Sequence, residues 1–245
     1  MVGSWVTFAE TSSAEIMARA GFDWLTVDME HSAITLSQAQ ELIRVISLCG
    51  VCPLVRLSSN DAALAKRVMD AGAGGVIVPM VNSGGEARAA VESVKYPPEG
   101  RRSVGMWSAQ GYGPDFDEYV AAANRESLVL VQIEHVEAVA RLQEILAVPG
   151  IDGLMVGPYD LSASMGLAGQ LDHPDVLDAL DRIAAAARAR NIPAGLHVVR
   201  PSPDELLAKV AAGYRLLAYS VDFLLLGETC RRDLRQLRSA LDASS

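Results

Sequence analysis

The feature that most constrains this chain is a regular alternation between short apolar runs and longer helical patterns. Eight runs rich in Val, Leu and Ile are bounded by turn residues, which is typical of β-strands. The predicted strands cover residues 5–8, 24–28, 54–56, 76–79, 128–134, 153–156, 194–198 and 216–220. Eight alternations within 245 residues predict an α/β fold of the (β/α)8 TIM-barrel type.

The predicted strands are apolar on both faces. Parallel strands that are covered by helices have this property, whereas the strands of an antiparallel sandwich alternate between apolar and polar residues. No linker or shift of composition divides the chain, so residues 1–245 are predicted to form one domain. The predicted helices include residues 36–48, 62–71, 138–146, 176–190 and 204–212, with a last helix at roughly residues 222–241.

One stretch, residues 96–117, is rich in Gly and Pro and is predicted to be irregular. A loop of this length is usually functional.

Charge and cysteine content exclude several classes of protein. The net charge of −9 repels a phosphate backbone and an anionic membrane surface, so we expect neither a nucleic-acid nor a membrane partner. Three cysteines are too few for a disulfide framework and indicate a reducing compartment. Cys49 and Cys52 form a C-x-x-C pair, which we interpret as small apolar residues at a helix end and a strand start. Because no leader or membrane-spanning pattern is found, we expect a soluble, cytoplasmic protein.

Charged side chains stand at the ends of several predicted strands. In a parallel barrel, the C-terminal ends of the strands form one mouth, where catalytic groups project. We therefore expect four carboxylates, one imidazole and one guanidinium to meet there: Asp28, Glu30, Glu134, Asp160, His31 and Arg56.

Such a cluster of carboxylates needs a cation to offset its charge in a partly dry cleft. A divalent metal fits, because carboxylate oxygens are the hard ligands that Mg²⁺ and Mn²⁺ prefer, and waters and substrate oxygens can complete the coordination. Glu134 and Asp160 are the candidate ligands. The alternative is that these residues are helix caps or salt-bridge partners, and Asp160 in particular could cap a short turn.

The loops after the seventh and eighth predicted strands argue against a sugar-phosphate substrate. Phosphate sites of barrels use Gly-rich loops at this position. Residues 197–201 and 220–223 contain no Gly, and Asp222 would repel a phosphate.

A series of motifs over nearly the whole chain resembles the HpcH/HpaI family of class II pyruvate aldolases. The motifs stand in the order of the family. They are GFDW at residues 21–24, VDMEH at 27–31, VR at 55–56, VMDAGA at 68–73, VPMV at 78–81, YPPEG at 96–100, VQIE at 131–134 and GPYDLS at 157–162.

This resemblance implies a carbon–carbon lyase that cleaves a 4-hydroxy-2-oxo acid into pyruvate and an aldehyde, or runs the reverse addition, through a metal-stabilised pyruvate enolate. The implied cofactor is a divalent metal, Mg²⁺, Mn²⁺ or Co²⁺. Glu134 and Asp160 match the family's metal ligands. Gln132, Tyr159 through its backbone, and Asp160 match the substrate-binding positions.

The resemblance also implies three catalytic residues. His31 matches the general base, Arg56 the residue that stabilises the enolate oxygen, and Asp70 the partner that raises the basicity of His31. The chemistry of these side chains agrees, because a guanidinium can stabilise developing negative charge and an imidazole titrates near neutrality. No lysine stands at a strand end to form a Schiff base, which favours the metal route over an imine route.

A homo-oligomer, trimer or hexamer, is implied as well, with the last helix swapped onto a neighbouring barrel. Residues 223–226 carry more apolar surface than one helix face needs. Asp70 precedes the fourth strand whereas His31 follows the second, so they are expected at opposite ends of one barrel. We therefore predict that Asp70 reaches the His31 of a neighbouring subunit.

Some positions depart from the family pattern, and other functions stay open. Ser108 lies where many relatives carry Arg, so the residues that select the aldehyde cannot be read from the motif. His135 follows Glu134 and is interpreted as a loop residue that faces away from the metal. The alternatives are a malyl- or citramalyl-thioester lyase of the same superfamily, which would want a basic surface, and a catalytically silent barrel that acts as a binding protein.

Overall fold

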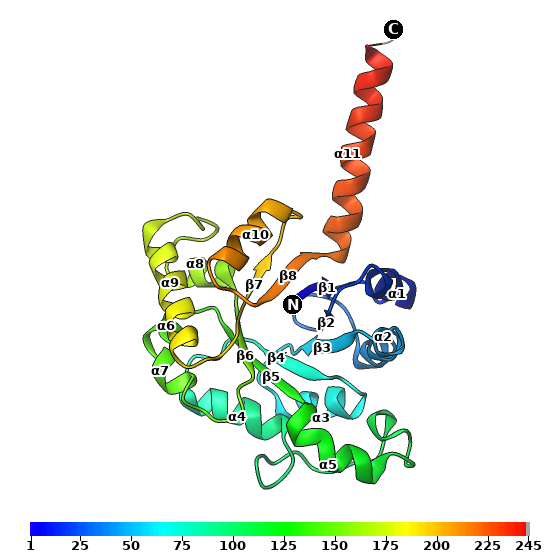
Figure 1. Cartoon of the computed structure of the whole chain (residues 1–245), viewed down its shortest axis with the longest axis vertical. Helices are drawn as coiled ribbons and strands as arrows, with labels where there is room; N and C mark the ends of the chain where they lie inside the picture. The colour runs from blue at the N-terminus through cyan, green and yellow to red at the C-terminus, as the bar shows by residue number, and fades with distance from the viewer. Residues whose placement is uncertain (244–245) are drawn as a thin grey trace.

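A computed structural model describes residues 1–243 and confirms the predicted barrel. Eight parallel strands close into a ring in chain order, and β1 pairs with both β2 and β8 (Figure 1). The strands are β1 (Val2–Val6), β2 (Trp24–Asp28), β3 (Cys52–Arg56), β4 (Gly75–Val78), β5 (Leu128–Ile133), β6 (Gly153–Val156), β7 (Ala194–Val198) and β8 (Leu216–Val221).

Helices follow the strands and cover the outside of the ring. Several begin where a side chain caps the first turn: Thr35 caps α2 and Ser202 caps α10. The helices are α1 (Thr11–Arg19), α2 (Leu36–Leu48), α3 (Ala62–Asp70), α4 (Gly84–Val94), α5 (Phe116–Glu126), α6 (Val136–Ala140), α7 (Leu142–Ile145), α8 (Pro158–Ser164), α9 (Pro174–Ala189), α10 (Pro203–Ala211) and α11 (Asp222–Asp242). The 3-10 turn η1 covers Ser108–Gln110.

Two apolar clusters explain why the strands carry apolar residues on both faces. The larger one joins the outer face of the barrel to the helices. The smaller one fills the barrel interior with one or two side chains from most strands, among them Trp24, Leu54, Leu130 and Met155. A closed barrel therefore buries both faces of each strand, as a packed TIM barrel does.

The alternation of side chains along each strand also determines which polar residues reach the mouth. Residues two positions apart point to the same side of a strand. Arg56 follows the interior residue Leu54 by two positions, and Gln132 follows Leu130 in the same way. The inward rows of β3 and β5 thus end in a polar residue at the C-terminal mouth.

Two predicted boundaries are wrong for identifiable reasons. The first strand covers Val2–Val6 and not residues 5–8, because the backbone N–H groups of Thr7 and Phe8 donate to the Asp222 carboxylate, at 2.7 and 2.8 Å, and leave the sheet. The predicted helix over residues 138–146 is divided into α6 and α7, since Arg141 departs from helical geometry with φ −112° and ψ 17°.

The long segment over residues 96–117 is largely irregular, as predicted, but it contains η1 and the start of α5. Its anchor is the buried Arg102, whose guanidinium donates to the Tyr96 and Tyr119 hydroxyls at 2.7 Å each. Cys49 ends α2 and Cys52 begins β3, and both are partly buried free thiols, in agreement with their interpretation as small apolar residues.

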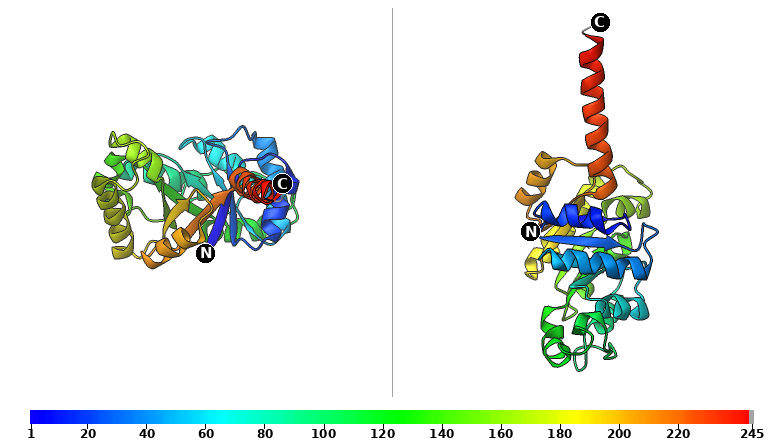
Figure 2. Two further views of the ribbon diagram at one scale, coloured as in Figure 1. Left: turned by 90° about the horizontal axis from the view of Figure 1, so that it is seen from above. Right: turned by 90° about the vertical axis from the view of Figure 1, so that its right-hand side faces the viewer.

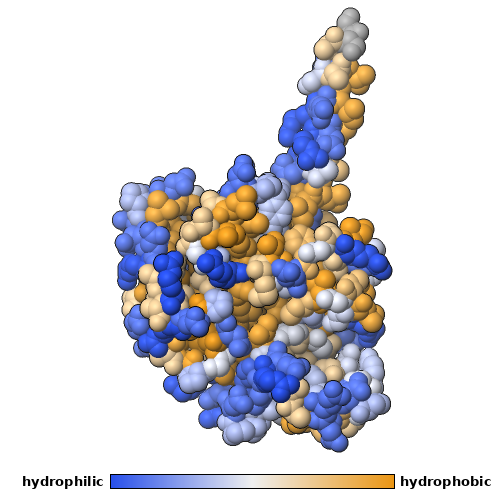
Figure 3. Space-filling model, in the orientation of Figure 1, coloured by the Kyte–Doolittle hydropathy of each residue, from blue (hydrophilic) through white to orange (hydrophobic). Residues whose placement is uncertain are grey.

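The last helix, α11, does not pack along the barrel. It starts at the mouth, directly after β8, and projects away from the barrel in Figure 1 and in the right-hand view of Figure 2. Of its residues only Asp222 is buried, and Phe223, Leu226, Leu234 and Leu237 are exposed. Figure 3 shows apolar side chains along one side of this helix and hydrophilic ones on the other. No helix within residues 1–243 is both long and apolar enough to cross a membrane, and the cytoplasmic location stays a prediction.

Candidate active site

A cavity of about 380 Å³ lies at the C-terminal mouth of the barrel. It is built from six of the residues that the sequence predicts at the mouth or in the site, and from groups on or next to β1, β7 and β8 that sequence reasoning did not select. The lining residues that matter chemically are Asp28, His31, Arg56, Gln132, Tyr159, Asp160, Trp5, Thr7 and His197.

A two-bond ion pair forms the floor of this site. Asp28 and Arg56 are register partners on β2 and β3. Arg56 Nε donates to Asp28 Oδ1 at 3.0 Å, and Arg56 Nη2 donates to Asp28 Oδ2 at 2.5 Å. Burial by itself would raise the pKa of Asp28, but the hydrogen bonds and charge of Arg56 lower it below its ordinary value. Asp28 is therefore a carboxylate that fixes the orientation of the guanidinium.

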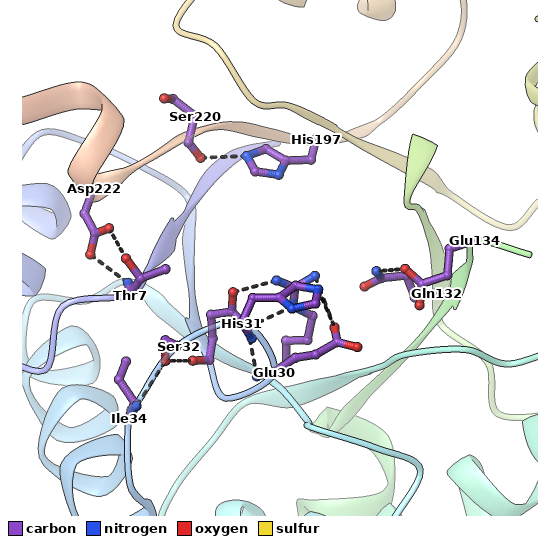
Figure 4. Close-up of polar contacts among 12 residues, drawn as sticks. Thr7, Glu30, His31, Ser32, Ile34, Gln132, Glu134, His197, Ser220 and Asp222 are labelled. Atoms are coloured by element: carbon purple, nitrogen blue, oxygen red, sulfur yellow. Dashed lines mark hydrogen bonds and ion pairs between the residues drawn. The ribbon is translucent and has the colours of Figure 1, made fainter. Parts of the chain in front are cut away.

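The loop after β2 brings Glu30 and His31 to the same guanidinium. Glu30 Oε2 lies 3.3 Å from Arg56 Nη1 and 3.7 Å from His31 Nε2. The backbone N–H groups of Glu30 and His31 both donate to Asp28 Oδ1, at 3.0 and 3.2 Å, which holds the loop in a tight turn. The His31 side chain is exposed toward the mouth, beside Glu30 (Figure 4). Burial raises the pKa of Glu30 to about 7, with Glu134 and Asp160 adding like charge.

Glu134 is buried directly after β5, and its contacts come from uncharged donors. Its Oε1 accepts the Met80 N–H at 2.7 Å, and its Oε2 accepts the side-chain amide of Gln132 (Figure 4). Met80 has φ 53°, a left-handed conformation that non-glycine residues rarely adopt, and this turns its N–H toward the carboxylate. A Cβ on Gly157 would lie 2.6 Å from Glu134 Oε2, so only glycine leaves space for this carboxylate.

Asp160 and Tyr159 reach the cavity from the first turn of α8, on the far side of Gly157. The N-cap residue of α8 is Gly157, and Asp160 stands at the third helical position, so Asp160 is not the residue that caps this helix. It faces Glu134 closely enough for its charge to raise the pKa of that residue, after the larger effect of burial. The Tyr159 side chain is about half exposed. The backbone carbonyl oxygen of Tyr159 accepts a hydrogen bond from the Ser162 hydroxyl.

The donor set of this site fits a divalent cation. Arg56 balances Asp28 and Glu30, whereas in residues 1–243 neither Glu134 nor Asp160 forms an ion pair. The Gln132 Oε1 atom, beside Glu134, is buried without a hydrogen-bond partner. No group of three or more His, Cys, Asp or Glu suited to a metal occurs in the described chain. Two carboxylates that leave most positions to water and substrate suit Mg²⁺ better than a closed structural zinc site.

Sequence reasoning missed a row of side chains beside Arg56. The guanidinium carbon lies 4.3 Å from the centroid of the Trp5 ring, and that ring packs against His197 with centroids 5.5 Å apart. Both residues occupy inward strand positions near the mouth, and an inward-facing register argument for β1 and β7 could have found them. His197 Nε2 lies 2.9 Å from the Ser220 carbonyl oxygen (Figure 4).

The structure does not bring Asp70 to His31 within one chain. Asp70 ends α3, pairs with Arg102 at 3.4 Å and lines a separate cavity of about 530 Å³ with Trp107. Burial raises the pKa of Asp70. Its role toward His31 stays a prediction that requires a second subunit. His135 is the N-cap residue of α6, where its Nδ1 accepts the Glu137 N–H at 3.2 Å.

The fold and this site together define a TIM-barrel enzyme whose mouth combines a pair of unneutralised carboxylates with a fixed guanidinium and an imidazole. A profile of the HpcH/HpaI aldolase/citrate lyase family matches residues 1–226. The chain belongs to this family, which confirms the resemblance of its motifs.

Individual proteins that are similar to this chain include named aldolases and a solved structure of the same family. The chain is 40% identical over 223 residues to a hydroxypyruvate/pyruvate aldolase of Sagittula stellata, covering 90% of this chain and 87% of that one. It is also 40% identical over 228 residues to a 4-hydroxy-2-oxo-heptane-1,7-dioate aldolase of Salmonella typhimurium, covering 92% and 85%. A crystal structure of an HpcH/HpaI aldolase/citrate lyase family protein from Burkholderia cenocepacia superposes with a TM-score of 0.93 at 34% identity, covering 97% and 94%.

Proposed function

We propose that this protein is a divalent-metal-dependent aldolase that cleaves 4-hydroxy-2-oxo acids into pyruvate and an aldehyde, and catalyses the reverse addition. The observation that carries the proposal is the pair of unneutralised carboxylates, Glu134 and Asp160, set opposite the Arg56 guanidinium at one mouth. The names of the aldolases at 40% identity support the same reaction class.

Glu134 and Asp160 would hold the metal, with Gln132 and the backbone at Tyr159 beside them to contact the oxo acid. A bound divalent metal would supply Lewis-acid stabilisation of the keto oxygen. The Gln132 amide nitrogen already donates to Glu134, whereas its Oε1 atom has no partner in the described chain, so this acceptor is free for the substrate hydroxyl group or a water.

Arg56 stabilises the negative charge that develops on the substrate oxygen when the carbon–carbon bond breaks. Its fork is oriented before substrate binds, because two of its nitrogens are held by Asp28 and a third lies near Glu30. Preorganised donors of this kind lower the barrier without reorganisation during the reaction.

His31 acts as the base that takes the proton of the substrate hydroxyl, directly or through a water. It stands at the open side of the cavity, with its Nε2 near Glu30 and its backbone N–H fixed by Asp28. An imidazole is suited to this step because the ordinary pKa of this type of side chain lies near neutral pH.

A coupled assay with lactate dehydrogenase tests the function. Each member of a panel of 4-hydroxy-2-oxo acids is incubated with the protein and Mg²⁺, Mn²⁺ or Co²⁺, and pyruvate release is followed as NADH oxidation. We expect release with at least one substrate and one metal. A thioester lyase would instead release product only from the CoA thioesters that are included as a separate arm.

A homo-oligomer is part of the proposal. The exposed apolar residues of α11, together with its projection away from the barrel, support its packing on a second copy of this chain (Figures 1 and 3). The second copy would also bring Asp70 within reach of His31. Sedimentation velocity should give a trimer or hexamer, and a monomer at micromolar concentration would contradict this assembly.

A further inference from the structure

The reaction proposed above leaves one polar group of the mouth without a role. His197 lies on β7, is partly buried and lines the same cavity as Arg56 and Asp160. The His197 ring packs against the Trp5 ring, and the Arg56 guanidinium also contacts the Trp5 ring. The Trp5 ring therefore connects His197 to Arg56, the residue proposed to stabilise the substrate oxygen.

A hydrogen bond determines which nitrogen of this ring carries the proton. His197 Nε2 lies 2.9 Å from the backbone oxygen of Ser220. A carbonyl oxygen can only accept, so Nε2 must donate, and in the neutral ring Nδ1 is then an acceptor. Burial lowers the pKa of His197 to about 4, with the nearby Arg56 charge adding to the effect, so the ring is neutral at pH 7.

The carbonyl that fixes this tautomer is itself held in place. Ser220 has φ 57°, a left-handed conformation that is rare for residues with a side chain. The Ser4 hydroxyl contacts the same carbonyl oxygen at 3.3 Å and the Tyr219 carbonyl oxygen at 2.8 Å. The end of β8 is thus locked with its oxygen directed at the imidazole.

The other ring nitrogen faces the open mouth. Figure 4 shows Nδ1 of His197 on the side of the ring turned toward the space between His31 and Gln132. In the part of the chain that the structure describes, the hydrogen bond to Ser220 is the one made by this ring. A fixed acceptor beside a substrate cavity can discriminate between ligands that offer a donor and ligands that do not.

We propose that His197 is a specificity-determining residue whose Nδ1 accepts a hydrogen bond from a substrate hydroxyl group, so that the site prefers hydroxylated substrates over their deoxy analogues. This inference rests on the proposed aldolase function. The hydroxyl belongs either to the oxo acid, as in hydroxypyruvate, or to the aldehyde, as in glycolaldehyde, and both present the same donor.

Two matched substrate pairs test the proposal and distinguish the two sources of the hydroxyl. The first pair is hydroxypyruvate and pyruvate with a common aldehyde, and the second is glycolaldehyde and acetaldehyde with pyruvate. For each pair the ratio of kcat/KM values, hydroxylated over deoxy, is measured in the parent and in two variants. His197→Leu removes the acceptor, whereas His197→Asn keeps an oxygen at the same number of bonds from Cβ as Nδ1.

We expect the parent to favour the hydroxylated member of one pair. In His197→Leu that ratio should fall by about 3- to 10-fold, which corresponds to one neutral hydrogen bond. His197→Asn should retain most of the preference, and Ser220→Gly, which keeps the carbonyl, should retain it as well. Ratios that are equal in the parent and in His197→Leu for both pairs overturn the proposal.

A measurement without turnover separates this proposal from the aldolase function itself. In a ¹⁵N-histidine NMR spectrum of the parent at pH 7, His197 should show the neutral tautomer with the proton on Nε2. If no substrate is turned over, the proposed aldolase function is wrong, whereas the NMR spectrum still shows which nitrogen of His197 carries the proton. A proton on Nδ1, or a parent without preference in either pair, overturns the role of His197 even where His197→Leu does not fold.

Discussion

Asp28 and Arg56 are direct neighbours across β2 and β3, and they join through two parallel hydrogen bonds of 3.0 and 2.5 Å. Register alone places them side by side, because both end their strands at inward positions of the barrel. The bidentate pair directs a planar guanidinium at the cavity while Trp5 supports its face. The geometry of this pair is the reason a lysine is not equivalent at position 56.

Replacing Arg56 by Lys should lower kcat by about 10²-fold, the scale for loss of one oxyanion donor. The ammonium keeps the charge but cannot hold Asp28 with two bonds and contact a substrate oxygen in fixed geometry. Steady-state pyruvate release measures the effect. Arg101→Lys is the matched control, because Arg101 is exposed and pairs with Glu92 on the surface. An Arg56→Lys variant with parental kcat would refute the role of the guanidinium.

Gly157→Ala should disable the carboxylate pair without touching either carboxylate. The added methyl group would lie 2.6 Å from Glu134 Oε2 and 2.9 Å from Glu134 Cβ, so Glu134 must move. A displacement of this kind costs about 10²-fold in activity. Gly85→Ala serves as the control, since a Cβ there meets only the Ser83 hydroxyl at 3.8 Å. Activity of Gly157→Ala equal to that of Gly85→Ala would show that the close packing has no catalytic consequence.

The depressed pKa of His197 predicts a pH-dependent contribution to stability. Between pH 6.5, its ordinary pKa, and about 4, the unfolded state binds more protons at this residue than the folded state. The free energy of unfolding therefore falls on acidification through this window, by at most about 1.4 kcal/mol per pH unit from this group. Glu30 and Glu134 have raised pKa values, so their contribution to the free energy of unfolding changes in the opposite direction; this contribution is common to the parent and to a variant at position 197.

Urea unfolding of metal-free parent and His197→Asn at pH 7 and pH 5 checks this prediction. The variant should lose less stability on acidification than the parent does. Equal losses in the two proteins would mean that His197 is not held neutral in the folded state.

Subunit mixing tests whether Asp70 completes a neighbouring site. Asp70 and His31 line separate cavities of one chain. We expect His31→Ala and Asp70→Ala proteins to be inactive alone and to regain part of the activity after subunit exchange, because some hybrid sites contain both residues. A fluorescent label on each variant verifies exchange. No recovery in verified hybrids would mean that Asp70 does not complete a neighbouring site.

Much of the fold follows from local sequence signals. Strand and helix patterns are strong where both faces of a strand are buried, so β2 and α2 have the predicted bounds. The bounds of the first strand differ from the prediction because Phe8 extends an apolar run in the sequence, whereas in the structure its N–H donates to the Asp222 carboxylate, 214 residues away. A long-range contact of this kind leaves no signal in a sequence window.

The site was predictable to the extent that strand ends meet at one mouth. This rule places Asp28, Arg56 and Asp160 at the same mouth. It could not reveal the contact of Met80 with Glu134, which depends on a left-handed backbone, or the orientation of the His197 ring, which depends on a cross-strand carbonyl. Nor could it place Asp70, which ends α3 and lines a separate cavity.

The central claim is that Glu134 and Asp160 hold a metal required for aldol cleavage. The most direct measurement is pyruvate release by chelator-treated protein before and after Mg²⁺ or Mn²⁺ is restored, for the parent, Glu134→Ala and Asp160→Ala. We predict that the treated parent is inactive and recovers with metal, and that both variants stay folded by circular dichroism but inactive at every metal concentration. Full activity of either variant, or of the chelator-treated parent without added metal, would contradict it.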